Sequence, residues 1–272
     1  MTDTAPVFAR ENRIEQIAKI ALPVTVLLAS VGLWEYLCWL WDTPFYKLPR
    51  PSLIFTTLIN DWPTLSTSLW VTLRTTFLAL ILAVVGGVGI AILFTRSKWI
   101  ELTFYPYAVV LQVTPIIAIA PLMLIYLDVN SAVLLCAWIV AFFPILSNTT
   151  LGLLSADHNL RSLFELYRAS GWQTLWYLKL RAALPYFLSG LKIGGGLSLI
   201  GAIVGEFTAG TGGQGSGLAY RILESQYRLN IPRLFAALML ISFTGICIFL
   251  VLSLLSHLLL RKWHESAVRR EN

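Results

Sequence analysis

Side chains that could carry out catalysis are scattered along this 272-residue chain and form no recognisable set. The three histidines, His158, His257 and His264, lack the spacing of metal ligands. There is no Ser/His/Asp arrangement and no pair of carboxylates suited to acid–base chemistry. A phosphate-binding loop of the form Gly-x-x-x-x-Gly-Lys-Ser/Thr is also missing. We therefore expect no enzyme activity, cofactor or metal in the chain itself.

One glycine-rich segment, Gly210–Gly215, matches the dinucleotide-binding pattern Gly-x-Gly-x-x-Gly. That pattern binds a dinucleotide only inside a βαβ unit, whereas an apolar segment of helical length precedes it here. We interpret the segment as a flexible loop.

Three ionisable residues inside or beside apolar segments are better functional candidates: Glu206, Arg74 and Glu35. A charge in hydrocarbon costs about 2.5–3.5 kcal/mol on insertion scales, so such a group is a functional hypothesis by default. Glu206 would either serve a path through the membrane or simply end its helix in the headgroup region. Glu35 and Arg74 would either pair with each other or each face such a path.

The composition identifies the solvent around these residues. Hydrophobic residues make up 57% of the chain and charged residues 12%, about half the usual charged share of a soluble domain. Each apolar stretch is long enough for the roughly 20 residues that a membrane-crossing helix needs. We predict six spans in one transmembrane domain, 20–260, between a segment 1–19 and a tail 261–272: 20–41, 72–95, 102–126, 132–155, 185–209 and 234–258.

The distribution of Lys and Arg predicts the orientation of these spans. With the N-terminus in the cytoplasm, the inner segments hold thirteen Lys and Arg residues and the outer segments hold five. This asymmetry predicts that both termini are cytoplasmic. Because the cations lie beside apolar stretches, the net charge of +6 does not indicate a nucleic-acid partner.

The inner loop 157–182 predicts an amphipathic helix. Asp157 or Asn159 could cap it, and Gly171 could end it. Its apolar side chains recur at helical spacing in Leu160, Leu163, Phe164 and Tyr167. Such a helix either docks into the groove of a partner or lies flat on the bilayer.

Several short runs around this loop occur together in a known family. They are Leu48–Ser52, Ala182–Tyr186, Gly190–Ile193, Gly205–Phe207 and Gly215–Leu218. With them, the chain resembles the permease subunits of bacterial ABC importers of the nitrate/sulfonate/taurine/bicarbonate type, which include transporters for pyrimidine precursors of thiamine. The resemblance covers most of residues 45–260, and its motifs are specific jointly rather than singly.

The family carries a Glu-Ala-Ala…Gly motif in its inner loop, and two registers place it on this chain. Matched at Gly171, the acidic position is Glu165. Matched through the run that starts at Gln173, the glycine position holds Arg168 and the acidic position holds Ser162. The longer flanking match favours the second register. The resemblance implies contact with an ATPase by Ser162, Leu163, Phe164, Glu165, Leu166, Tyr167, Arg168, Ala169, Ser170, Gly171 and Gln173.

The resemblance implies an all-α membrane protein with six transmembrane helices, the type I importer architecture and a cytoplasmic coupling helix. The expected partners are two ATP-binding subunits, a second permease copy (a homodimer or a pair of like subunits), a periplasmic substrate-binding protein and the lipid of a bacterial inner membrane.

The implied function is the translocation path of a small solute by alternating access, with Glu206, Arg74 and Glu35 as path or gate candidates. The solute would be a small anion such as nitrate, a sulfonate or bicarbonate, or a pyrimidine-like compound. The alternative is an ion-coupled secondary transporter that acts without an ATPase and needs buried carboxylate or histidine pairs.

Overall fold

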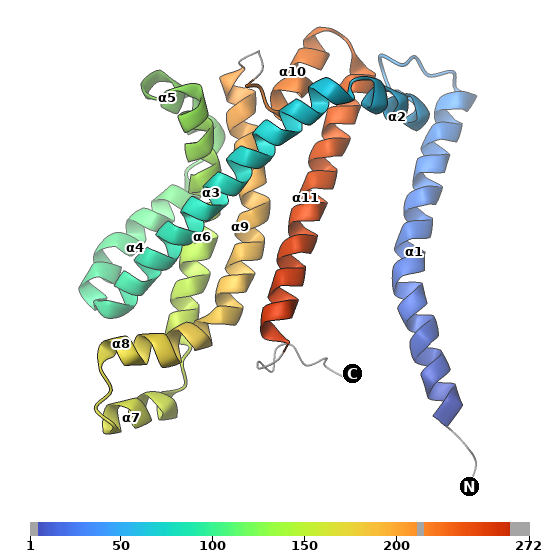
Figure 1. The fold of residues 1–272 in the computed structure, drawn as a ribbon. Coiled ribbons are helices and arrows are strands. Elements are labelled where there is room, and N and C mark those ends of the chain that lie inside the picture. Colours follow the sequence, from blue (N-terminus) through green and yellow to red (C-terminus); the bar gives the residue numbers. More distant parts are fainter. Residues whose placement is uncertain (1–4, 211–214, 262–272) are drawn as a thin grey trace. The chain divides into compact units, whose positions relative to one another are not determined.

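A computed structural model describes residues 5–210 and 215–261, and this part of the chain consists of helices joined by short connections (Figure 1). In chain order they are α1 Ala5–Leu40, α2 Pro51–Asn60, α3 Trp62–Arg96, α4 Lys98–Val113, α5 Ile116–Tyr126, α6 Val129–Leu154, α7 His158–Leu166, α8 Gly171–Gln173, the π-helix η1 Thr174–Lys179, α9 Leu180–Ala209, α10 Leu218–Tyr227 and α11 Ile231–Leu260.

Five stretches of helix are long and apolar enough to cross a membrane: Ala21–Leu40, Trp62–Arg96, Val129–Leu154, Gly171–Ala209 and Ile231–Leu260. Two of them are longer than the sequence predicted by more than ten residues. α3 starts at Trp62 rather than at residue 72, and helix precedes residue 185 continuously from Gly171. The connections between the predicted spans contain two further helices, α2 and α10.

The segment 102–126, predicted as one span, consists of two helices. α4 and α5 meet at an angle of 100°, so the described helices contain five spans, or six where this bent pair is counted as one broken span. The break lies at Thr114 and Pro115, where Thr114 is extended with φ −70° and ψ 123°. Proline lacks an N–H donor and forces the preceding residue out of the helical region, so the helix stops here.

The chain divides into two compact units. The first contains the residues up to Trp62 together with Ser225–Ala236. Within it, the rings of Trp34 and Phe235 lie 5.9 Å apart, and Arg233 forms an ion pair with Asp61 at 3.4 Å. These contacts join the start of α11 to the N-terminal helices.

The second unit contains Pro63–Glu224 and the residues from Ala237 onward. Its centre is the packing of α6 against α9, which run side by side (Figure 1). A Cβ added to Gly201 would lie 2.7 Å from the Cα of Ala137, and one added to Gly205 would lie 2.9 Å from the Cα of Val133. Only glycine allows the two backbones to come this close, as is common between membrane helices.

Candidate functional site

Glu206 lies in the last turn of α9 and is only 6% exposed. Its carboxylate accepts hydrogen bonds from the hydroxyl of Thr72, at 2.8 Å, and from the backbone N–H of Ala219, at 3.0 Å. α9 ends just beyond it because Gly210 adopts the left-handed φ of +56°. The buried carboxylate therefore joins the C-terminal end of α9 to α3 and to the start of α10.

Thr72 completes a cap for α10. Its hydroxyl oxygen also accepts the backbone N–H of Leu218, at 2.9 Å. The first N–H groups of a helix lack partners within the helix and favour a negative charge. The first two of α10 are satisfied here by Thr72 and Glu206, side chains from two other helices.

A further contact holds α10 against α3. The Nε of Arg221 donates to the hydroxyl of Ser68 at 2.8 Å, and its Nη1 pairs with Glu224 at 2.8 Å. Ser68 and Thr72 lie four residues apart, on one face of α3. The first turns of α10 are thus fixed along this face of α3.

Gly217 is required for this arrangement. A Cβ added to Gly217 would overlap the Glu206 carboxylate. The chain therefore passes directly over the carboxylate, and any larger residue at this position must displace it. The sequence identified Glu206 as a candidate, but its contacts with Thr72 and the start of α10 carry no sequence signal.

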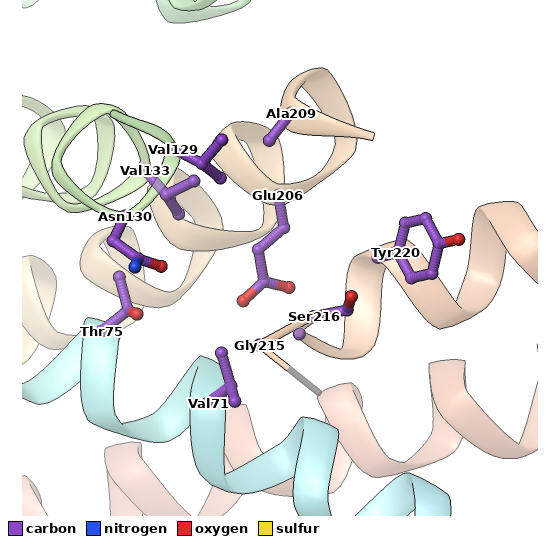
Figure 2. A pocket seen from close by; sticks show the side chains of 11 residues that line it. Val71, Thr75, Val129, Asn130, Val133, Glu206, Ala209, Gly215, Ser216 and Tyr220 are labelled. Carbon is purple, nitrogen blue, oxygen red and sulfur yellow. The ribbon is translucent and has the colours of Figure 1, made fainter. Parts of the chain in front are cut away.

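Figure 2 shows Glu206 pointing into a small pocket beside Thr75, Asn130 and Val71. Its volume of about 20 Å³ has room for one water molecule. A larger groove of about 350 Å³ is lined by several of the same residues together with Trp70 and Arg74.

Arg74 is exposed along this groove. It forms no hydrogen bond or ion pair with the residues that the structure describes. Beside the guanidinium, Asn130, Ser131 and Thr75 offer amide and hydroxyl groups, and Trp70 offers an aromatic face. Asp128 is the N-cap residue of α6. Hydrogen bonds from the side chain and backbone of Ser131 lower the pKa of Asp128.

Glu35 lies in the first unit and has a local partner. Its carboxylate accepts hydrogen bonds from the Ser52 hydroxyl, at 2.8 Å, and from the Ser52 backbone N–H, at 3.0 Å. Ser52 is in the first turn of α2. Glu35 therefore caps α2, a role that the sequence did not suggest.

At the other end of the second unit, Asp157 begins α7. Its carboxylate accepts hydrogen bonds from the backbone N–H groups of Asn159 and Leu160, at 2.7 and 3.1 Å. Of the two candidates that the sequence offered, Asp157 and Asn159, the cap is therefore Asp157. Arg161 then donates to the carbonyl of Leu154 at 2.6 Å, which gives the last turn of α6 a cationic partner.

α7 ends at Leu166, and the left-handed residue that terminates it is Arg168 rather than Gly171. The N–H of Arg168 bonds to the carbonyl of Glu165 and the N–H of Ala169 to that of Phe164, which is a Schellman motif. Arg168 takes the left-handed φ of +51° that this motif usually assigns to glycine. The expectation that Gly171 ends the helix was wrong, because Gly171 starts α8 after a capping box of Ser170 and Gln173.

The left-handed backbone at Arg168 can be compared with the two registers of the family motif. The second register matches Arg168 to the glycine of the family motif, and Arg168 has the conformation that favours glycine. We expect Arg168→Gly to raise stability by up to about 1 kcal/mol, because glycine has no Cβ penalty there. The melting temperature of the purified protein checks this. Gly171→Ala, the matched control, should be neutral, since its Cβ would meet only the flexible end of Arg96 at 3.3 Å.

The predicted coupling residues surround an open groove of about 360 Å³. It is lined from α7 and from the following helical segment by Leu163, Phe164, Tyr167, Ala169, Gln173 and Tyr177. Tyr167 is 78% exposed and Leu166 80%. The structure thus brings five of the eleven predicted coupling residues, Leu163, Phe164, Tyr167, Ala169 and Gln173, together around one groove.

One contact of this surface was not foreseen. The guanidinium carbon of Arg96, the last residue of α3, lies 4.5 Å above the ring of Trp172 in α8. No spacing rule links two residues so far apart in the sequence.

Comparison with known proteins gives a consistent result. Residues 83–270 match the family model described as "binding-protein-dependent transport system inner membrane component". The chain is 30% identical to the riboflavin transport system permease protein of Chloroflexus aurantiacus, over 98% of this chain and all of that protein. It is also 30% identical to the formylaminopyrimidine transport permease protein of Halalkalibacterium halodurans, over 88% of this chain and 94% of that protein.

A solved structure shares the fold. The crystal structure of an amino acid ABC transporter with histidines superposes with a TM-score of 0.60 and 21% identity, over 74% of this chain and 97% of that one.

Proposed function

Because the chain belongs to the family of binding-protein-dependent transport system inner membrane components, we propose that it forms the translocation path of an importer driven by two separate ATP-binding subunits. The chain is a permease subunit with the ABC permease fold, located in the inner membrane, and its family is not itself catalytic. A second permease copy and a periplasmic binding protein complete the proposed complex. Both termini would face the cytoplasm.

The coupling segment, residues 157–182, would carry the movement of the ATPase into the membrane. Its support is the groove between α7 and the following helical segment, whose lining comes from both. A helix lying flat on lipid would present a single convex apolar stripe instead. The residues from Ser162 to Gly171, with Gln173, would form the contact, in the second of the two registers.

The groove beside Arg74 would be the outer part of the path, and Glu206 would hold it shut. In alternating access, closure of the ATP-binding subunits would move the coupling segments and open the outer side, and hydrolysis would restore the inward state. Glu35, bonded to Ser52, would fix α2 rather than contact solute.

The proposed solute is a small planar nitrogen-containing ring. Two relatives that cover most of this chain are named for riboflavin and formylaminopyrimidine transport. Trp70, Arg74 and Asn130 would suit such a ring, by stacking and by hydrogen bonding. Small anions such as nitrate are the second candidate, since the same guanidinium would attract them.

Purification of the tagged chain from its native membranes in mild detergent tests this function. We expect an ATP-binding subunit at near-equal stoichiometry, identified by mass spectrometry, and ATP hydrolysis in the preparation. A chain that purifies without an ATPase, under conditions that preserve a known importer, would favour the ion-coupled alternative.

A further inference from the structure

We infer that α3 is the rod that connects the coupling segment to the outer closure, and that Arg96 and Trp172 are the positioning residues at its inner end. This inference rests on the proposed function. It adds a second route between the ATPase and the outer side, besides the direct continuation of the coupling segment into α9. Both ends of the rod lie within the second unit of the chain.

The inner end of the rod is a contact between a cation and an aromatic face. Arg96 is the last residue of α3, and its guanidinium lies over the Trp172 ring at 4.5 Å. The same guanidinium lies close to Gly171, where an added Cβ would be 3.3 Å from Nη1. Arg96 therefore follows the first turn of α8, directly after the residues proposed to contact the ATPase.

The outer end of the rod is the cap of α10. Thr72 of α3 donates to Glu206 and accepts from Leu218, and Ser68 accepts from Arg221. A shift of α3 relative to α9 must break or lengthen the bond between Thr72 and Glu206, because the two residues belong to different helices. The hydrogen bonds of this cap therefore change when α3 changes its position relative to α9.

The body of α3 is suited to transmit such a shift. The 25 residues from Thr72 to Arg96 correspond to about 36 Å of helix, which is most of the thickness of a bilayer. No proline interrupts this stretch. A helix without a break moves along its axis as one body. In the pair α4 and α5, by contrast, an axial displacement would change the angle at the proline-broken bend and would not reach the other end.

The test places a reporter at the outer end and changes the inner end. Gly215→Cys is a suitable reporter, because Gly215 is exposed and an added Cβ would have nothing within 4 Å. The complex is purified with its native ATPase, and labelling by a membrane-impermeant maleimide is timed with and without ATP and vanadate. The chain without the reporter gives the background from Cys38, Cys136 and Cys247.

We expect ATP with vanadate to change the labelling rate of the reporter at least about fivefold, the lower range of coupling between distant sites. Trp172→Leu, which keeps apolar bulk but no ring, should reduce this change to less than about twofold, and Trp172→Phe should retain most of it. Arg96→Gln should behave like Trp172→Leu, and the double variant should lose no more than either single one.

Lys98→Ala is the matched control, because Lys98 is a nearby cation that pairs with Glu101 instead. It should leave the response unchanged. An equal response from Trp172→Leu and Trp172→Phe, or a full response from Arg96→Gln, would overturn the inference while the proposed function stands. Loss of the ATPase, or no response in the unchanged complex, would instead contradict the proposed function and the inference with it.

Discussion

Glu206→Ala is expected to lower solute uptake at least about tenfold while the protein still inserts and assembles. The substitution leaves the Thr72 hydroxyl and the Ala219 N–H without their acceptor in a buried site. Each unpaired buried group costs about 1–3 kcal/mol, so the start of α10 should detach from α3 and α9. Uptake per copy of the protein in the membrane measures the effect.

Three further variants separate charge from shape at this site. Glu206→Gln keeps the volume and one acceptor, so it should fall between the wild type and Glu206→Ala. Gly217→Ala should resemble Glu206→Ala, because its Cβ would displace the carboxylate. Glu101→Ala, which removes a carboxylate from an ion pair with Lys98 at the start of α4, should have little effect. Wild-type uptake by Glu206→Ala would remove this residue from the proposed closure.

Deletion of residues 160–172 should abolish association with the ATPase and leave membrane insertion intact. It removes nearly all of α7 and the first residues of α8, while the membrane-crossing part of α9 is untouched. The amount of ATP-binding subunit that co-purifies with the chain measures the loss.

A paired substitution gives the same test without a deletion. Phe164→Ala with Tyr167→Ala removes two of the three aromatic side chains of the coupling groove and should reduce association at least about tenfold. Tyr126→Ala, at an 83% exposed tyrosine at the end of α5, is the control. Normal association after either change to the coupling segment would contradict its assignment.

Local sequence rules predicted the parts of the structure that depend on local chemistry. The apolar stretches became helices, and Asp157, one of the two predicted candidates, became the cap of α7. The break between α4 and α5 lies at Thr114 and Pro115. The angle of that break was not predictable, because proline prevents continuation of a helix without setting its new direction. The length of α3 was also not predicted, because its first ten residues precede the predicted span.

The candidate site shows the same division. Glu206 was identifiable because a carboxylate in an apolar segment is costly. Its partner Thr72 lies in a distant helix, and a threonine in an apolar helix has no distinguishing pattern. The end of α7 was not predicted correctly, because the left-handed position that follows it is occupied by Arg168 and not by glycine. Glu35 drew attention for the same reason as Glu206, yet its bonds are to neighbouring α2.

The coupling segment is proposed to contact an ATP-binding subunit, and photo-crosslinking from Tyr167 detects that contact. A photoreactive phenylalanine derivative replaces Tyr167, which is exposed beside the coupling groove, and in a matched chain replaces Tyr126. After irradiation of native membranes, we expect a crosslinked product from position 167 that contains an ATP-binding subunit, and no such product from position 126. Crosslinks from position 167 to lipid alone, in membranes that contain the ATPase, would contradict the proposed contact.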